Sequence, residues 1–170
     1  LTVNLAFLIT IYCFMIEIER KFLVNSKSYR AEASSVITIT QGYLNSDPDR
    51  SVRVRLTDQT GFLTVKGKSN SSGLSRFEWE KELSKTDAEA LLKLCENTII
   101  SKTRYNVLVG AHTFEVDEFL ADNNGLIIAE VELGSEDEKF YKPDWLGEEV
   151  TGIPKYYNSN LSNTPVCNWK

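Results

Sequence analysis

The sequence has few of the residues on which several common protein sites depend. Its 170 residues include one histidine, one methionine and three cysteines, and its 19 basic residues are outnumbered by 24 acidic ones. Because His112 is alone, no pair of histidines is available for catalysis. The net charge of −5 argues against non-specific binding to nucleic acid or to an anionic membrane, since that affinity comes from a surplus of Lys and Arg.

The cysteines are odd in number, widely spaced and outside any CxxC pattern. This distribution argues against a disulfide framework and against a structural zinc site, and we expect the protein to work in a reducing cytoplasm. A Walker-type phosphate loop is absent too. Phe62 stands where that pattern, ending here in Gly67-Lys68-Ser69, requires glycine.

A hydrophobic segment long enough to cross a bilayer is also missing. Residues 1–14 carry no charge, but a spanning helix needs about 20 apolar residues, and the segment lacks the cationic start and cleavage site of a signal peptide. We expect translation to start at Met15 and residues 1–14 to be a misassigned leader; the alternative is a genuine membrane-directing segment. Residues 15–170, with the composition of an ordinary globular chain, would then form a single domain.

What the sequence has in abundance is alternation of polar and apolar residues with a period of two, which is typical of β-strands. Short turn sequences separate the alternating segments and favour antiparallel neighbours. About eight strands are predicted, at residues 16–24, 36–44, 51–57, 61–66, 75–83, 101–109, 112–119 and 126–133.

Helices are predicted at three places. The segment from Thr86 to Glu89 has the pattern of a capping box, and Ser135 to Glu138 has the same pattern ahead of a shorter helix toward Tyr141. Residues 27–34 have room for one or two further helical turns.

Ionisable residues recur two apart within these strands, so they collect on one face of each strand while apolar residues collect on the other. Two arrangements fit this pattern. An open sheet would leave its charged face in water. A closed sheet would turn the charges inward, around a space that holds side chains or one small ligand.

An inward charged face implies an ionic ligand, because burying ions costs several kcal/mol each unless something neutralises them. The basic set suits a chain of phosphates, and the acidic set offers the oxygen ligands that Mg²⁺ or Mn²⁺ prefers. Both sets together fit a metal-bound polyphosphate. The basic set is Arg53, Arg55, Lys66, Lys68, Lys102 and Arg104, and the acidic set is Glu17, Glu19, Glu78, Glu80, Glu115, Asp117, Glu130 and Glu132.

The ordered motifs resemble those of the CYTH, or triphosphate tunnel metalloenzyme, superfamily, and most closely its short bacterial tripolyphosphatases. The opening strand has the Glu-x-Glu-x-Lys pattern at Glu17, Glu19 and Lys21, and the later motifs are QGYL, VRVRL, TVKGK, GLSRFEWE, KTRY, FEVDEF, AEVEL and GEEVTGIPKYYN. The resemblance implies an α+β fold: a closed eight-stranded antiparallel β-barrel, forming a tunnel open at both ends, with helices packed outside.

The resemblance also implies roles for individual residues. Lys21 and Tyr43 match a catalytic pair, in which a tyrosine beside an ammonium would ionise more readily; the alternative is that Tyr43 only positions a phosphate. Substrate-binding positions are matched by Arg53, Arg55, Lys66, Lys102, Arg104 and Lys155; metal-binding positions by Glu17, Glu19, Glu130 and Glu132; and further tunnel carboxylates by Glu78, Glu80 and Asp117.

The expected activity is metal-dependent hydrolysis of a triphosphate, inorganic tripolyphosphate to pyrophosphate and phosphate, with Mg²⁺ or Mn²⁺ as cofactor. Three alternatives share the same grip on phosphate and cations: a class IV type adenylyl cyclase, a thiamine triphosphatase, and a non-catalytic polyphosphate or nucleotide sensor. In each case the expected partner is a small polyanion.

Overall fold

The computed structural model describes residues 16–169, and the leader predicted at residues 1–14 lies outside that range. Strands dominate the described chain, and the helices are short. The strands are β1 (Ile16–Val24), β2 (Ala33–Asn45), β3 (Arg50–Leu56), β4 (Gly61–Gly67), β5 (Ser75–Leu83), β6 (Glu96–Val109), β7 (His112–Phe119), β8 (Ile127–Glu132) and β9 (Leu146–Glu149). The α-helices are α2 (Tyr29–Glu32), α3 (Lys85–Leu92) and α4 (Asn158–Asn163), with 3-10 turns at Ala121–Asn123, Pro154–Tyr156 and Val166–Asn168.

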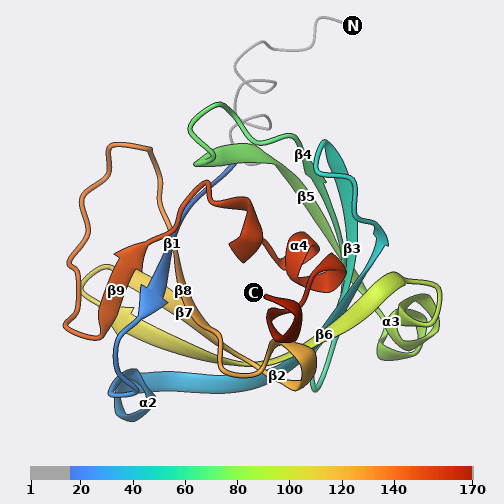
Figure 1. The fold of residues 1–170 in the computed structure, drawn as a ribbon, viewed down its shortest axis with the longest axis horizontal. Coiled ribbons are helices and arrows are strands. Elements are labelled where there is room, and N and C mark those ends of the chain that lie inside the picture. The colour runs from blue at the N-terminus through green and yellow to red at the C-terminus, as the bar shows by residue number, and fades with distance from the viewer. Residues whose placement is uncertain (1–15, 170) are drawn as a thin grey trace, which may run out of the picture.

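Eight of these strands close into an antiparallel ring (Figure 1). Their order is β5-β4-β3-β2-β6-β7-β8-β1, and a pairing of β1 with β5 joins the two ends. One edge of β1 pairs with β8, while its other edge pairs with β5 at Ile16 to Ile18 and then with β9 from Phe22 to Val24. The predicted fold class, a closed eight-stranded antiparallel sheet with helices, is confirmed.

The strand register turns the charged faces into the ring. Tyr43 lies opposite Arg53, Arg53 opposite Thr64, and Thr64 opposite Glu80, across four neighbouring strands. Opposed residues of an antiparallel pair point to the same face, so this row projects together. The inward arrangement of charges is therefore the correct one of the two that the sequence allowed.

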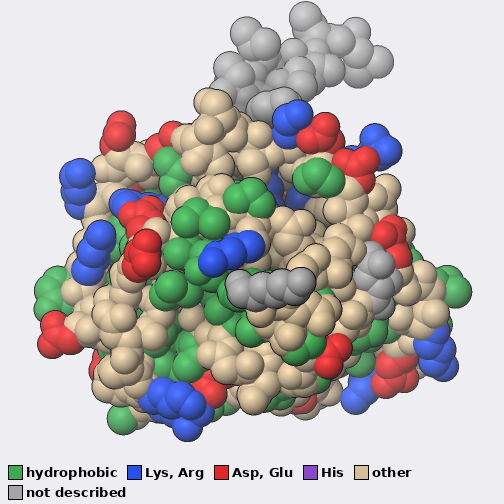
Figure 2. All heavy atoms as spheres, in the orientation of Figure 1, with side chains coloured by type: hydrophobic (Ala, Val, Ile, Leu, Met, Phe, Trp, Pro, Cys, Tyr) green, Lys and Arg blue, Asp and Glu red, His purple; other side chains and the backbone are tan. Residues whose placement is uncertain are grey.

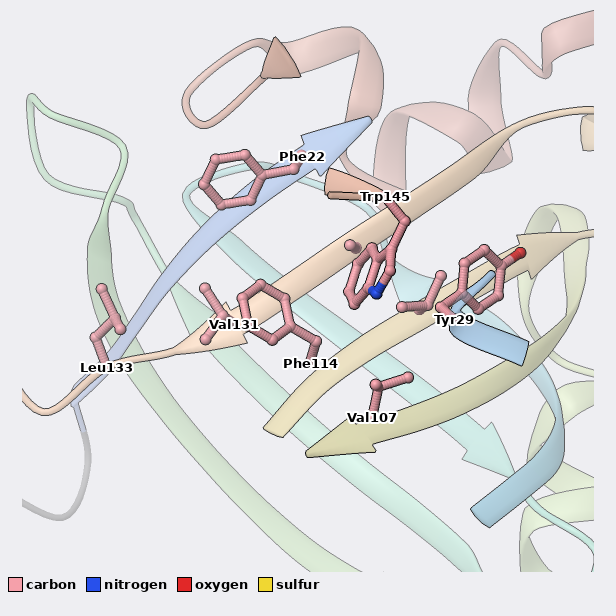
Figure 3. Close-up of a cluster of buried hydrophobic side chains, with 9 residues drawn as sticks. Phe22, Tyr29, Val107, Phe114, Val131, Leu133 and Trp145 are labelled. Atoms are coloured by element: carbon pink, nitrogen blue, oxygen red, sulfur yellow. The ribbon is translucent and has the colours of Figure 1, made fainter. Parts of the chain in front are cut away.

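The apolar faces pack outside the ring, in a core that α2 and the segment before β9 cover (Figure 3). Phe22, Phe114 and Val131 are fully buried there, and Trp145 is 1% exposed. Trp145 meets Phe114 edge to face with ring centroids 5.4 Å apart, a favoured geometry for aromatic pairs. Burial of each such side chain contributes roughly 1.5–3 kcal/mol, so this core holds the ring closed from the outside.

Helix α3 covers another part of the outer face, against β2, β3 and β4. A Cβ atom on Gly61 would lie 2.3 Å from the Ala88 Cβ, so this close approach requires glycine. The helix begins after Ser84, whose hydroxyl accepts from the Asp87 backbone N–H at 3.1 Å. The cap is thus Ser84 and not the predicted Thr86.

One end of the tunnel is closed by the C-terminal part of the chain, which corrects the expectation of a tunnel open at both ends. Leu23, Ile100, Phe119 and Ile128 occupy inward positions at that end, and Leu161 of α4 is buried against this cluster. In Figure 1, α4 and the C-terminal end of the chain lie within the outline of the ring, and Figure 2 shows hydrophobic side chains gathered over the same region. We name this cluster the apolar plug.

Two segments differ from the sequence prediction. Residues 135–141 form a turn followed by irregular backbone instead of a helix, and Phe140 at its end packs against the outer core. Strand β9 was not predicted. No helix of residues 16–169 is long and apolar enough to cross a membrane.

Candidate functional site

The inner face of the ring surrounds a cavity of about 180 Å³, far more than the roughly 10–15 Å³ that one water needs. Nearly every side chain on its wall is charged or polar. Its lining consists of Glu17, Glu19, Lys21, Tyr43, Ser51, Arg53, Arg55, Lys66, Arg76, Glu78, Glu80, Arg104, Glu115, Glu130, Glu132, Tyr157, Asn158 and Ser159. The structure therefore brings together twelve of the predicted site residues, from β1 to β5, β6 and β8.

Carboxylates gather on the wall made by β1, β7 and β8. Glu19 lies directly opposite Glu132, and Glu115 opposite Glu130, so side chains of like charge face each other across two strand pairs. Glu132 makes no ion pair within the described residues; burial and the neighbouring carboxylates, Glu17 first among them, raise its pKa. Each of the other carboxylates of this wall has a Lys or Arg partner, so Glu132 is the one carboxylate of this wall whose charge is left unbalanced by residues 16–169.

Guanidinium groups gather on the opposing part of the wall, on β3. Arg53 is 6% exposed and donates to the Thr64 hydroxyl at 3.0 Å. Arg55 has no carboxylate within ion-pair distance among residues 16–169, and its buried Nε has no hydrogen-bond partner there. Burial, together with the charges of Arg53 and Arg104, lowers the pKa of Arg55 to about 10. Arg53 Nη2 has Glu78 and Glu80 oxygens at 3.9 and 3.5 Å, so Arg55 is the guanidinium of this strand that has no carboxylate partner among residues 16–169.

Other charged side chains of the cavity form ion pairs with one another. Lys66 Nζ lies 2.8 Å from Glu17 Oε2 and 2.7 Å from Glu78 Oε2. Arg76 bridges the two leading carboxylates, with Nε 2.9 Å from Glu17 Oε2 and Nη2 3.1 Å from Glu19 Oε1. Such pairs satisfy buried charges that would otherwise cost several kcal/mol each.

Arg76 was not among the predicted site residues. It precedes Glu78 and Glu80 on β5 by the same two-residue step, and this alternation was the signal that could have identified it.

The predicted catalytic pair is present but its chemistry differs from expectation. The Lys21 ammonium pairs with Glu130, and despite its burial the carboxylates Glu130 and Glu19 raise its pKa. Tyr43 is 5% exposed, and burial raises the pKa of its phenol more than the nearby cations lower it. The expectation that Tyr43 ionises more readily is therefore wrong. It stays a neutral hydroxyl, able to donate a hydrogen bond.

Lys102 and Asp117 lie in the wall behind the cavity lining. Asp117, 1% exposed, accepts from Arg104 through Nε at 2.7 Å and Nη2 at 2.6 Å, and it also pairs with Lys102. Burial lowers the pKa of Lys102 to about 8. The two hydrogen bonds to Asp117 hold the guanidinium of Arg104 in a fixed position and set its direction toward the cavity.

Lys155, also predicted to bind substrate, lies neither in the cavity lining nor in the wall behind it. It is exposed on the outer side of the C-terminal segment, where its ammonium lies 4.8 Å from the Tyr156 ring centroid and 5.1 Å from that of Trp169.

The metal implied by the resemblance fits the acidic wall in its chemistry. Carboxylate oxygens are the ligands that Mg²⁺ and Mn²⁺ prefer, and the raised pKa of Glu132 reports unneutralised negative charge at that wall. Within residues 16–169, no three acidic, histidine or cysteine side chains are already arranged as a complete metal centre. Substrate oxygens and water would have to complete the coordination.

Comparison with known proteins gives a consistent result. Residues 15–163 match the CYTH domain family. The chain is 49% identical over 155 residues to an inorganic triphosphatase of Acetivibrio thermocellus, with 91% of this chain and 97% of that protein covered. It is 38% identical over 153 residues to an inorganic triphosphatase of Nitrosomonas europaea, covering 87% and 97%. A crystal structure of an inorganic triphosphatase superposes with a TM-score of 0.61 at 32% identity, over 86% of this chain and 93% of that one.

Proposed function

Since this chain belongs to the CYTH domain family, we propose that it is a metal-dependent triphosphatase whose substrate is inorganic tripolyphosphate, cleaved to pyrophosphate and phosphate. Its curated relatives at 49% and 38% identity are both inorganic triphosphatases. Matches that cover 97% of each relative support the transfer of activity to the whole described fold.

One observation carries the proposal. A single cavity contains both a guanidinium group without an ion-pair partner among residues 16–169, Arg55, and a carboxylate destabilised by its acidic neighbours, Glu132. An anion alone would pair with Arg55 but would be repelled by Glu132. A polyphosphate carrying a divalent cation satisfies both, because Mg²⁺ commonly binds through one or two carboxylates together with phosphate oxygens.

The basic residues would bind the phosphate chain. Arg53 and Arg55 offer planar forks suited to phosphoryl oxygens, while Arg104 is aimed by its bonds to Asp117. Lys66 would exchange part of its pairing with Glu17 for a phosphate oxygen. Lys102 would contribute its charge from behind the wall, where its partner is Asp117.

The acidic residues Glu17, Glu19, Glu130 and Glu132 would hold the cation, with Glu78, Glu80 and Asp117 balancing the basic residues around the substrate. A bound Mg²⁺ or Mn²⁺ would offset charge on the phosphoryl oxygens and activate water for attack.

The two predicted catalytic residues would stabilise charge and position the substrate. Lys21, whose pKa is raised, remains an ammonium and donates to a phosphoryl oxygen as negative charge builds there. Tyr43, whose pKa is also raised, donates a hydrogen bond from its neutral hydroxyl. Water would attack the terminal phosphorus in line, the bond from that phosphorus to the bridging oxygen would break, and pyrophosphate would leave with the bonding electrons. The proton that the water loses would pass to a phosphate oxygen of the products or to solvent.

The test is phosphate release by the purified full chain with Mg²⁺ or Mn²⁺, comparing tripolyphosphate, pyrophosphate, ATP and thiamine triphosphate. Preferential turnover of tripolyphosphate supports the proposal, and preference for thiamine triphosphate reassigns the substrate. Cyclic AMP formed from ATP would identify a cyclase, and tight binding of tripolyphosphate without turnover would identify a sensor. The proposed compartment remains the cytoplasm, on the cysteine distribution of the sequence.

A further inference from the structure

The inner wall contains one buried amide that forms no hydrogen bond. Gln41 on β2 is 0% exposed, and neither its Oε1 nor its Nε2 has a hydrogen-bond partner in the described part of the chain. An unsatisfied buried polar group costs about 1–3 kcal/mol relative to an apolar group of the same shape, and such groups in folded proteins call for an explanation. Gln41 belongs to the QGYL motif, of which only Tyr43 has an assigned role.

The strand register identifies the charged residue directly opposite this amide. Gln41 lies opposite Ile100 on one side and opposite Arg55 on the other, and its neighbours on the same face of β2 are Ile39 and Tyr43. Directly opposed residues have Cβ atoms about 4.5–5.5 Å apart, which is within reach of two long side chains. The only ionic side chain among these four neighbours is therefore Arg55.

Arg55 has a matching deficiency. Its Nε is buried without a hydrogen-bond partner, and no carboxylate of residues 16–169 forms an ion pair with its guanidinium. An acceptor without a partner, Gln41 Oε1, and a donor without a partner, Arg55 Nε, thus belong to directly opposed residues of one strand pair. Of these two residues, only Arg55 lines the cavity. Gln41 does not line the cavity, so it can act on a substrate through a neighbour that does, and Arg55 is the charged one directly opposite it.

We propose that Gln41 is a positioning residue for Arg55: when phosphoryl oxygens engage the terminal nitrogens of the guanidinium, Gln41 Oε1 accepts from Arg55 Nε and fixes the direction of the fork. The inference rests on the proposed function. Before substrate binds, the unmade bond costs stability; once substrate is bound, the bond is formed and part of that cost returns as affinity. Stability and substrate binding are thus set against each other at this one position.

The first test is Gln41→Met, which keeps the size and flexibility of the side chain but removes its polar atoms. We expect the melting temperature of the substrate-free protein to rise by roughly 2–4 °C, since an unsatisfied amide disappears. We expect KM for tripolyphosphate to rise about tenfold with kcat changed by less than twofold, as for a lost ground-state contact. Lower stability with unchanged KM would show that Gln41 only supports the fold and would overturn the proposal.

A matched control for the stability arm is Asn123→Leu, which also replaces a buried amide by an apolar side chain. Asn123 is 2% exposed, but its amide is satisfied: Oδ1 accepts from the Val166 N–H at 3.0 Å and Nδ2 donates to the Leu161 carbonyl at 3.4 Å. This variant should lower the melting temperature. A fall of similar size in both variants would mean that Gln41 is hydrogen-bonded in the free protein.

A second test shows whether Gln41 acts through Arg55. In a double-mutant cycle with Arg55→Lys, which keeps the charge but removes the fork, adding Gln41→Met should cause no further rise in KM. Independent, multiplicative losses would refute the coupling. Calorimetric binding of tripolyphosphate gives the same cycle without turnover, so a wild-type protein that binds but does not hydrolyse would reject the proposed function while leaving this inference testable.

Discussion

Replacing Glu132 by glutamine should stabilise the metal-free protein and at the same time weaken its response to metal. Glu132 is an exposed carboxylate on β8 that forms no ion pair with residues 16–169, and Glu19 lies directly opposite it on β1. Its pKa is raised by partial burial and by the acidic residues around it. Removing this charge should therefore relieve repulsion.

The size of the effect follows from Coulomb's law with solvent screening. Two carboxylates about 6 Å apart repel by about 0.7 kcal/mol at the dielectric constant of water, which is the relevant limit for an exposed side chain. Several acidic neighbours, partly offset by Arg76, bring the total to about 1 kcal/mol at low ionic strength. For a chain of this length that corresponds to a rise of about 2–4 °C in melting temperature, and it should shrink at 1 M salt, where the Debye length is about 3 Å.

Two assays check this prediction: thermal unfolding of the metal-free protein at low and high salt, and the Mg²⁺ and Mn²⁺ dependence of phosphate release. The metal concentration for half-maximal rate should rise at least tenfold, as expected when a group that binds or orients the metal is lost. The matched control is Glu148→Gln, an exposed carboxylate of β9 that does not line the cavity, which should change neither quantity. A Glu132→Gln protein that is less stable, or that keeps the wild-type metal response, would refute the electrostatic argument.

Three further predictions concern substrate binding, the catalytic tyrosine and the outer surface. Arg53→Ala should raise KM for tripolyphosphate at least tenfold, the loss of one charged contact, without altering the metal requirement in the same kinetic assay. Tyr43→Phe should keep the shape of the wild-type pH–rate profile between pH 6 and 9, because burial keeps the phenol protonated; a basic limb that vanishes in the variant would show that Tyr43 does ionise. Glu118→Gln should destabilise the protein by about 1 kcal/mol at pH 7, since hydrogen bonds from Arg30 hold the pKa of Glu118 below its usual 4.5. That contribution is present above pH 4.5 and is lost as pH falls through the lower pKa that Glu118 has in the folded protein. The unfolding curves of the wild type and the variant should therefore differ at neutral pH and coincide in acid.

The eight strands of the ring could be predicted because alternation is a local property. A strand such as Arg50–Leu56 has Arg53 and Arg55 on one face and apolar residues on the other whatever it pairs with. The same regularity predicted most of the cavity lining, and it could also have included Arg76. The 135–141 segment failed because its capping pattern is equally local, while the packing of Phe140 onto the outer core is not.

Local sequence patterns could not predict two features of the fold, the pairing of β9 with β1 and the apolar plug. Strand β9 has only four residues, Leu146–Glu149, and is a strand because β1 offers it a free edge. The apolar plug combines inward residues of four ring strands with Leu161, more than 30 residues beyond the nearest of them in sequence. Neither pairing is visible from the composition of the segments that form it.

By itself, the sequence determined which residues share a face, because side chains alternate along every strand. It therefore determined that, although basic residues are outnumbered by acidic ones, basic side chains would gather on one face of β3 and acidic side chains on one face of β1 and of β8. Only the tertiary structure decided what those charges experience. Closing the ring buried Tyr43 and raised its pKa, and it left Gln41 and the Nε of Arg55 without hydrogen-bond partners among residues 16–169. It also paired Lys21 with Glu130 and placed Lys155 outside the cavity. These properties depend on distances between strands far apart in the chain, and such distances exist only once the ring is closed.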